Sequence, residues 1–181
     1  MDQERSFVMV KPDGVKRGLS DEIIKRLTDA GLSIVTRKDM QPTRELAYQH
    51  YADSDEWYLS VGTKTIGSYA KQGLAITDVF SADDPIVVGK QVREWLADFL
   101  TSGPVVAMII SGPIGTVQKI RDLVGATSPE FADKGTIRGD LGDDTYYKSN
   151  SSGRAFENLV HASESVVEAE REIKLWFPEL G

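Results

Sequence analysis

The chain has 181 residues, of which 40% are hydrophobic and 27% charged, and its formal net charge is −7. This length predicts a single domain over residues 1–181, with a core large enough to be stable without disulfides, and the sequence contains no cysteine. Broad electrostatic binding of nucleic acid needs a basic face, so the acidic balance argues against nucleic acid as a partner.

The ends and the interior of the sequence carry no sign of a membrane protein. No uninterrupted apolar run approaches the length of a transmembrane helix. Residues 1–5 are polar and acidic and lead into a strand-like run, which is not the pattern of a signal peptide. We therefore expect a cytoplasmic protein that does not associate with membranes.

The first third of the chain alternates strand and helix signals. Residues 6–10 form a β-favouring run that ends in the turn Lys11-Pro12-Asp13-Gly14. Helical spacing follows over residues 19–30, a second strand over 32–36 and a second helix over 43–51. Within that last helix we predict His50 to be a surface residue.

The remaining elements are less regular in the middle of the chain. Residues 57–59 form an aromatic cluster, residues 65–72 suit a short helix, and residues 87–100 have helical spacing. The second half predicts a continuously apolar strand over residues 105–110, a helix over 114–124 and a long aperiodic loop over 127–144. A polar exposed excursion over 146–154, a last strand over 156–162 and a helix over 165–176 that begins with a capping box follow.

Without the irregular middle, these elements have the order βαββαβ. This order predicts an α+β fold of the ferredoxin-like type, an antiparallel four-stranded sheet covered by helices on one face. The first and third strands are central in such a sheet, which suits the continuously apolar third strand. Two segments, over about residues 59–95 and 141–154, are predicted to be insertions into this fold.

His161 is the most informative polar residue, because it follows an apolar run and precedes a helix start in the stretch Asn158-Leu159-Val160-His161-Ala162-Ser163-Glu164-Ser165. A neutral imidazole at a strand end is a good nucleophile near neutral pH. On this stretch alone, a structural histidine is the simpler interpretation. Other polar side chains that suit a phosphate site lie at element ends or in the long loop: Lys11, Tyr51, Arg121, Thr127, Arg138 and Asn158.

Taken together, several blocks of the sequence resemble the nucleoside diphosphate kinase family. They cover most of the chain outside the two longer segments, and they read FVMVKPDGVKRGL from residue 7, HY at 50–51, SGPVVAM from 102, GTIRGD from 135, NLVHAS from 158 and EAEREIKLWF from 168. GTIRGD followed by N-x-x-H-x-S is the most specific part. This resemblance replaces the structural interpretation of His161 with a catalytic one.

The resemblance implies a two-step, ping-pong transfer of the γ-phosphoryl group from a nucleoside triphosphate to a nucleoside diphosphate. His161 matches the nucleophile, and Glu172 and Ser163 match the groups that orient its ring. Lys11, Arg121 and Arg138 match the cations on the phosphates, with hydrogen bonds from Tyr51, Thr127 and Asn158, of which Asn158 also suits a sugar hydroxyl. Mg²⁺ is expected to arrive on the nucleotide phosphates, with no metal ligands from the protein.

The family also implies a base platform and a homo-oligomer. An aromatic shortly after Tyr51 should stack on the base, and we favour Trp57 over Tyr58. Its aliphatic partner is Val160 or a residue of the Arg121 helix. The loop over residues 127–140 resembles one that supports trimer contacts, and the family contains both hexamers and tetramers.

Two departures and two competing functions stay open at this level. The longer segments flank the nucleotide site, and Glu157 stands where the family often has a basic residue, which weakens local attraction for phosphate. One alternative function is a non-catalytic regulatory or nucleic-acid-binding module on the same fold. The other is a histidine phosphocarrier, against which the arginines argue.

Overall fold

The computed structural model describes residues 3–180 and is built on a four-stranded sheet. Its strands are β1 (Gln3–Val10), β2 (Ser33–Met40), β3 (Val105–Pro113) and β4 (Val160–Ala162), in the order β2-β3-β1-β4. All three neighbouring pairs are antiparallel. The first and third strands are central, as predicted, and they have the longest buried runs.

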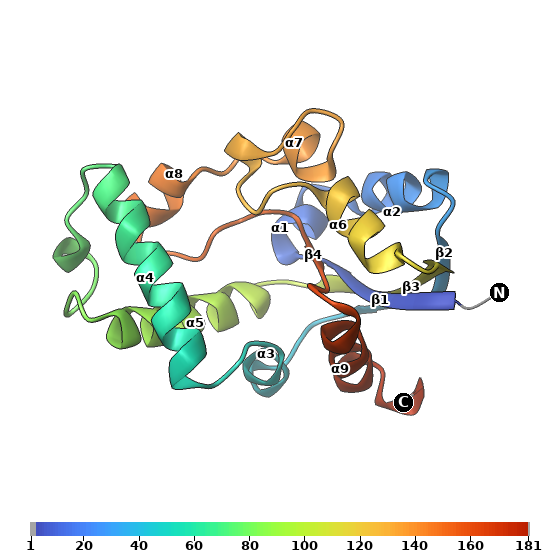
Figure 1. The fold of residues 1–181 in the computed structure, drawn as a ribbon, viewed down its shortest axis with the longest axis horizontal. Helices are drawn as coiled ribbons and strands as arrows, with labels where there is room; N and C mark the ends of the chain where they lie inside the picture. The colour runs from blue at the N-terminus through green and yellow to red at the C-terminus, as the bar shows by residue number, and fades with distance from the viewer. Residues whose placement is uncertain (1–2, 181) are drawn as a thin grey trace.

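One face of the sheet is covered by the helices α2 (Ser20–Asp29) and α6 (Thr116–Val124), which lie above the sheet in Figure 1. Side chains of a strand alternate between the two faces, and Val8 and Val10 of β1 point to this one. The core here also contains Ile23, Leu27, Met108, Ile110 and Ile120.

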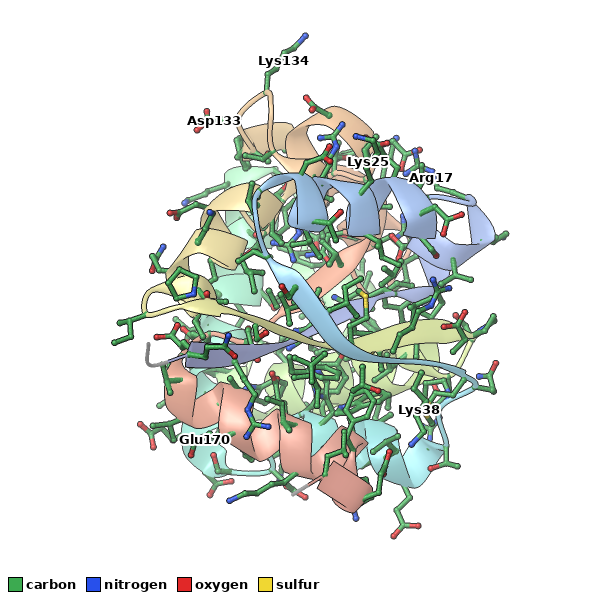
Figure 2. All side chains as sticks on the ribbon, turned by 90° about the vertical axis from the view of Figure 1, so that its right-hand side faces the viewer. Arg17, Lys25, Lys38, Asp133, Lys134 and Glu170 are labelled. Carbon is green, nitrogen blue, oxygen red and sulfur yellow. The ribbon has the colours of Figure 1, made fainter. Side chains whose placement is uncertain are left out.

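The opposite face is covered as well, so the prediction of helices on one face only was wrong. Phe7 and Met9 of β1 pack there against α3 (Arg44–His50), α5 (Pro85–Leu100) and α9 (Val166–Trp176). Figure 2 shows the sheet between the two layers, with Lys25 of α2 on one side and Glu170 of α9 on the other. Strands that are buried on both faces read as continuous apolar runs, which is how the central strands appear in the sequence.

The first longer segment folds into a helical hairpin of α4 (Asp55–Lys71) and α5, joined through the 3-10 helix η1 (Ile76–Asp78). The predicted short helix over residues 65–72 is therefore only the end of α4. The sequence pattern did not predict the first half of α4. This end of the helix is capped by Ser54, whose hydroxyl accepts a hydrogen bond from the Trp57 N–H (3.2 Å).

The second longer segment contains α8 (Tyr146–Ser151), which corrects the predicted exposed excursion over residues 146–154. Asn150 is buried, and its carbonyl accepts a hydrogen bond from the Tyr69 hydroxyl of α4 (2.7 Å). Its side-chain amide donates to the Ser68 hydroxyl (3.1 Å). The two longer segments are therefore docked on each other, as the neighbouring α4 and α8 show in Figure 1.

The remaining elements are short. The turn after β1 forms α1 (Pro12–Lys16), the aperiodic loop holds η2 (Pro129–Phe131) and α7 (Ile137–Leu141), and η3 (Pro178–Leu180) follows α9. Ser165 caps α9 as predicted, by accepting from the Glu168 N–H (3.2 Å). Within residues 3–180, no helix is both long and apolar enough to cross a membrane.

The last strand is shorter than predicted, with three residues in place of the expected run over 156–162. The residues before β4 give their N–H groups to carboxylates and not to a neighbouring strand. Glu157 N–H donates to Asp144 (2.9 Å), and Leu159 N–H donates to Asp13 (2.9 Å). The chain therefore enters the sheet only at Val160.

Candidate active site

His161 lies in β4, opposite Met9 of β1. Alternation along the strand turns it toward the face covered by α9, where Glu172 is buried. His161 Nε2 lies 2.8 Å from Glu172 Oε1, and the Ser163 hydroxyl donates to Glu172 Oε2 (2.6 Å). A carboxylate oxygen at that distance accepts the proton of Nε2–H, which leaves the Nδ1 lone pair available for chemistry.

Ser163 connects this pair to the central strand. Its hydroxyl oxygen accepts a hydrogen bond from the Phe7 N–H (3.1 Å) and is fully buried. Because the Ser163 hydroxyl also donates its proton to Glu172, it acts both as a hydrogen-bond donor and as an acceptor. The carboxylate is therefore held from two sides, and the imidazole is held by the carboxylate.

His50 is not a surface residue, which corrects the prediction from the helix pattern. It is 4% exposed, and its ring centroid lies 4.7 Å from that of His161. Its Nδ1 accepts a hydrogen bond from the Trp176 indole N–H (3.3 Å). Burial, followed by the charges of His161, Lys11 and Arg171, holds the pKa of His50 well below 6.5. His50 is thus a neutral packing partner of the His161 ring.

A cavity of about 330 Å³ opens beside His161. Three cationic side chains from separate elements border it: Lys11 after β1, Arg121 of α6 and Arg138 of α7. Thr127 and Asn158 add polar groups to the same wall. The structure therefore brings together five of the predicted phosphate-handling residues and the imidazole around one cavity.

Lys11 is buried against the cavity wall. Its ammonium donates to Asn158 Oδ1 (2.9 Å), and the Asn158 amide donates to the Thr127 carbonyl (2.9 Å). Burial, and secondarily the charge of Arg138, lowers the pKa of Lys11 to about 8. The amine therefore changes charge close to physiological pH in the free protein.

Arg138 is tied to the backbone on two sides. Its guanidinium donates to the carbonyls of Asn158 (3.1 Å) and Val160 (2.7 Å), and to that of Gly125 (3.1 Å). Burial, and then the nearby charge of Arg121, lowers the pKa of Arg138 to about 10. Arg121 itself is exposed, so the two arginines give the cavity one fixed and one accessible cation.

Four predicted site residues lie outside the cavity wall: Tyr51, Trp57, Ser163 and Glu172. The Tyr51 hydroxyl is buried and has no hydrogen-bond partner within residues 3–180, and burial, then the charge of Glu172, raises the pKa of Tyr51 well above its usual value. Trp57 is half-buried in α4 with its ring against Tyr58.

Comparisons with known proteins agree with this geometry. A family model described as nucleoside diphosphate kinase matches residues 4–82 and 85–180. A nucleoside diphosphate kinase of Pyrobaculum aerophilum is 42% identical over 179 residues, which is 99% of this chain and 97% of the relative. This chain belongs to the nucleoside diphosphate kinase family. It is an enzyme that transfers phosphate between nucleotides.

Solved structures of the nucleoside diphosphate kinase family support the same assignment. The structure of an NDP kinase from Pyrobaculum aerophilum has a TM-score of 0.94, with 43% identity over 97% of this chain and 96% of that one. A Borrelia burgdorferi nucleoside-diphosphate kinase, solved as a transition-state mimic with vanadate and ADP, has a TM-score of 0.75 and 28% identity over 97% and 87% of the two chains. The α+β, ferredoxin-like fold is confirmed.

Magnesium, which this kinase family implies, suits the cavity only as part of a nucleotide. Mg²⁺ prefers oxygen ligands in octahedral geometry and keeps several waters. Within the described chain the cavity wall is rich in cations, and Glu164 is its one carboxylate. His50, His161 and Glu172 have ligand atoms within 4.8 Å of one another, but two of the three are nitrogen donors. Phosphate oxygens would therefore have to supply the ligands.

The structure adds residues to this kinase site that the sequence pattern did not indicate. His50 packs on the nucleophile candidate, Asp13 receives the Leu159 N–H, and Lys11 lies 5.8 Å from the centre of the Phe99 ring. The HY and KPDG blocks contain two of these residues, so only their three-dimensional neighbours were missing. Glu157, which stands where the family often has a basic residue, borders a different cavity together with Asp13.

Proposed function

We propose that this enzyme transfers the γ-phosphoryl group of a nucleoside triphosphate to a nucleoside diphosphate through a phosphohistidine at His161. The observation that carries the proposal is the contact of His161 Nε2 with Glu172, which leaves the ring's other nitrogen available beside a cavity bordered by three cations. An enzyme that already transfers phosphate between nucleotides needs such a nucleophile only if the transfer has two steps.

In the first step, the His161 Nδ1 lone pair forms a bond to the γ-phosphorus. The bond to the oxygen that bridges the β- and γ-phosphates breaks, and the diphosphate leaves with its electron pair. The imidazole becomes positively charged, and Glu172 stabilises that charge across the 2.8 Å contact. In the second step, a terminal oxygen of another diphosphate forms the new bond, and the N–P electron pair returns to the ring.

The cavity wall supplies the electrostatic part of the reaction. Phosphoryl transfer depends chiefly on positioning and on stabilising charge on the equatorial oxygens. We assign that role to Lys11, Arg121 and Arg138, with Thr127 as a hydrogen-bond donor to phosphate and Asn158 as a sugar contact. Tyr51 adds a hydroxyl whose hydrogen-bonding capacity is unused in the described chain. Mg²⁺, bound to the nucleotide phosphates, would neutralise part of their charge.

For the base we propose Trp57 as the stacking platform. Tyr58 is 6% exposed and its hydroxyl donates to Asp53 (2.6 Å), so its ring is less available. For the aliphatic partner we favour Val124 of α6 over Val160, because Val124 borders the cavity and Val160 does not. Trp57→Ala should raise nucleotide KM several-fold, and Trp57→Phe should restore most of the affinity. A nucleotide KM in Trp57→Ala equal to that of the unmodified enzyme would contradict this assignment.

The competing functions have less support. A phosphocarrier that receives its phosphate from another protein does not need three cations around a cavity of about 330 Å³. A purely regulatory or nucleic-acid-binding role does not need the His161–Glu172–Ser163 chain of hydrogen bonds. The cytoplasmic location, the single domain over residues 1–181 and the hexameric or tetrameric assembly stay predictions.

The test uses the pure protein with γ-labelled ATP and Mg²⁺, followed by GDP. We expect an acid-labile, alkali-stable label on the protein, which then moves to GTP. His161→Ala should abolish the label. His50→Asn removes the chain's other imidazole and should keep the label, at a reduced rate because the packing around His161 changes. Label that persists in His161→Ala, or is lost only in His50→Asn, would overturn the proposal.

A further inference from the structure

Leu159, two residues before His161, has an unusual backbone conformation. Its φ angle is +70°, and among the described residues it is the one non-glycine with a positive φ. The Val160 N–H donates to the Asn158 carbonyl (2.8 Å), so the three residues form a γ-turn of the positive-φ type. This turn is rare and strained, and a bulky residue adopts it only where its surroundings enforce it.

The enforcing contacts come from three residues outside this turn. The Leu159 N–H donates to Asp13 Oδ2 (2.9 Å), and the Leu159 carbonyl accepts from the Lys11 N–H (2.8 Å). Arg138 donates to the carbonyls of the residues before and after Leu159 (3.1 and 2.7 Å). Each residue of the turn is therefore held by a partner distant in sequence.

The KPDG loop is shaped to receive this turn. A Cβ at Gly14 would lie 2.9 Å from the Leu159 carbonyl oxygen, so a side chain there would push the turn away. Asp13 is 8% exposed, and within residues 3–180 its Oδ1 has no hydrogen-bond partner although it is buried. A buried carboxylate is costly unless it is compensated, and its compensation here is the Leu159 N–H together with nearby cations.

The residues of the turn are those on which the reaction depends. Asn158 begins the turn and contacts the Lys11 ammonium (2.9 Å), and His161 is the residue directly after the turn. A shift of the turn would therefore move the proposed sugar contact, the lysine and the nucleophile together. A misplacement of about 1 Å in such groups can reduce a rate about 100-fold.

We propose that Asp13 is a positioning residue: its carboxylate holds the strained turn at Leu159 and thereby sets Asn158 and His161 in their reactive places. This role rests on the proposed phosphohistidine mechanism. The negative charge has a second effect, because Asp13 raises the pKa of Lys11 and Arg138 against the fall that burial causes.

The experiment compares three variants with the unmodified enzyme. Asp13→Asn keeps an oxygen that can accept from Leu159 N–H but removes the charge, and Asp13→Ala removes both. Asp143→Asn is the matched control, because it breaks an exposed ion pair to Arg17 at the end of α1 (3.2 Å) without touching the turn. The measurements are the single-turnover rate of His161 phosphorylation, the pH profile of kcat/KM and the thermal midpoint.

We expect Asp13→Ala to slow phosphorylation about 100-fold, Asp143→Asn to match the unmodified enzyme, and Asp13→Asn to stay within about five-fold of it at neutral pH. In Asp13→Asn the alkaline limb of kcat/KM should move to lower pH. The titratable groups around Lys11 are Arg138 of α7, Asp13 of α1 and the neutral His50 of α3, so this variant removes the one negative charge among them.

Two results would overturn the positioning role while leaving the mechanism intact. They are an unchanged rate in Asp13→Ala, and a rate in Asp13→Asn as low as in Asp13→Ala. If Asp13→Ala does not fold, Asp13→Asn decides. A phosphorylation rate reduced by much more than about five-fold, or an alkaline limb of kcat/KM that does not move, overturns the role. Absence of label on the unmodified enzyme overturns the proposed mechanism, and the role of Asp13 with it.

Discussion

At the scale of single residues, the polar groups next to His161 are connected by a continuous chain of hydrogen bonds. Glu172 is held by His161 on one oxygen and by Ser163 on the other, and Ser163 is held by the Phe7 N–H. Buried polar groups are costly when they lose a partner. Each member of this set should therefore affect both stability and catalysis when it is removed.

Ser163→Ala tests this expectation. It leaves Glu172 Oε2 buried without its hydroxyl donor, so we expect a loss of about 1–3 kcal/mol in unfolding free energy and a clearly lower rate of histidine phosphorylation. Ser165→Ala is the matched control, since it removes only the cap of α9 and should cost about 1 kcal/mol with little effect on the rate. Denaturant unfolding and single-turnover labelling measure both. Equal phosphorylation rates in the two variants would contradict the role of Ser163.

A second prediction at this scale concerns pH. The pKa of Lys11 is lowered to about 8, so the free enzyme loses this cation as the pH rises through that value. kcat/KM reports the free enzyme and should fall there, whereas kcat should fall only at higher pH because bound phosphate favours the charged amine. A kcat/KM that does not change between about pH 7 and about pH 9.5 would contradict the assignment of this pKa to Lys11.

The same group has the opposite effect on stability. The pKa of Lys11 is lower in the folded chain than its ordinary value of 10.5, so the unfolded chain binds the proton more tightly. The contribution of Lys11 to the unfolding free energy therefore rises with pH between about 8 and 10.5. Activity and this part of the stability should move in opposite directions over that window.

The residues of the site could be named from the resemblance to the family, but their partners could not. The blocks KPDG, GTIRGD and NLVHAS indicated Lys11, Arg138 and His161 directly. The face of α3 that carries His50 depends on how that helix packs against α9, which no local pattern contains. The contact between Asp13 and Leu159 joins positions 146 residues apart, so only the fold brings it into view.

At the scale of elements, regular helices and strands were predictable and the inserted hairpin was only partly so. The glycines of α4 interrupt its apolar spacing, which hid the first half of the helix. Gly62 and Gly89 lie where α4 and α5 touch: a Cβ on them would lie 1.8 Å from the Pro85 carbonyl oxygen and 2.2 Å from the Tyr58 carbonyl oxygen. The interruption is therefore a requirement of helix packing.

Gly62→Ala should separate the two helices and destabilise the protein by at least about 1–3 kcal/mol, because the methyl group has no room. Gly67→Ala in the same helix is the matched control. A Cβ there meets nothing within 4 Å, so the change should stabilise by about 0.5–1 kcal/mol through the lower entropy of the unfolded chain. Thermal unfolding of both variants measures the difference. A destabilised Gly67→Ala, or a neutral Gly62→Ala, would show that the helices are not packed in this way.

At the scale of the whole molecule, the order of elements predicted the sheet and its central strands, but not the second helical layer. The helices α3, α5 and α9 fall between or after the strands of the βαββαβ pattern, and sequence order alone does not assign a helix to a face. The second layer matters for function, because it carries Glu172 and His50 to the side of the sheet on which His161 lies.

The charge of the whole molecule gives a further prediction. The net charge is −7, and the cations of the His161 cavity are few and partly buried. We therefore expect no detectable binding of a 30-nucleotide single strand at protein concentrations of about 10 µM and about 0.15 M salt. Fluorescence anisotropy checks this, with ADP as a positive control for the cavity. Tight, salt-dependent binding of the strand would favour the nucleic-acid-binding alternative.

The strained turn at Leu159 has a consequence for how this chain tolerates change in length. It follows the second longer segment, whose Asp144 holds the Glu157 N–H, yet the anchors of the turn itself are Lys11, Asp13 and Arg138, which lie outside that segment. A displacement of residues 146–151 should therefore be opposed by these three anchors before the chain enters β4. Lengthening or exchanging residues 146–151 should therefore leave His161 in place.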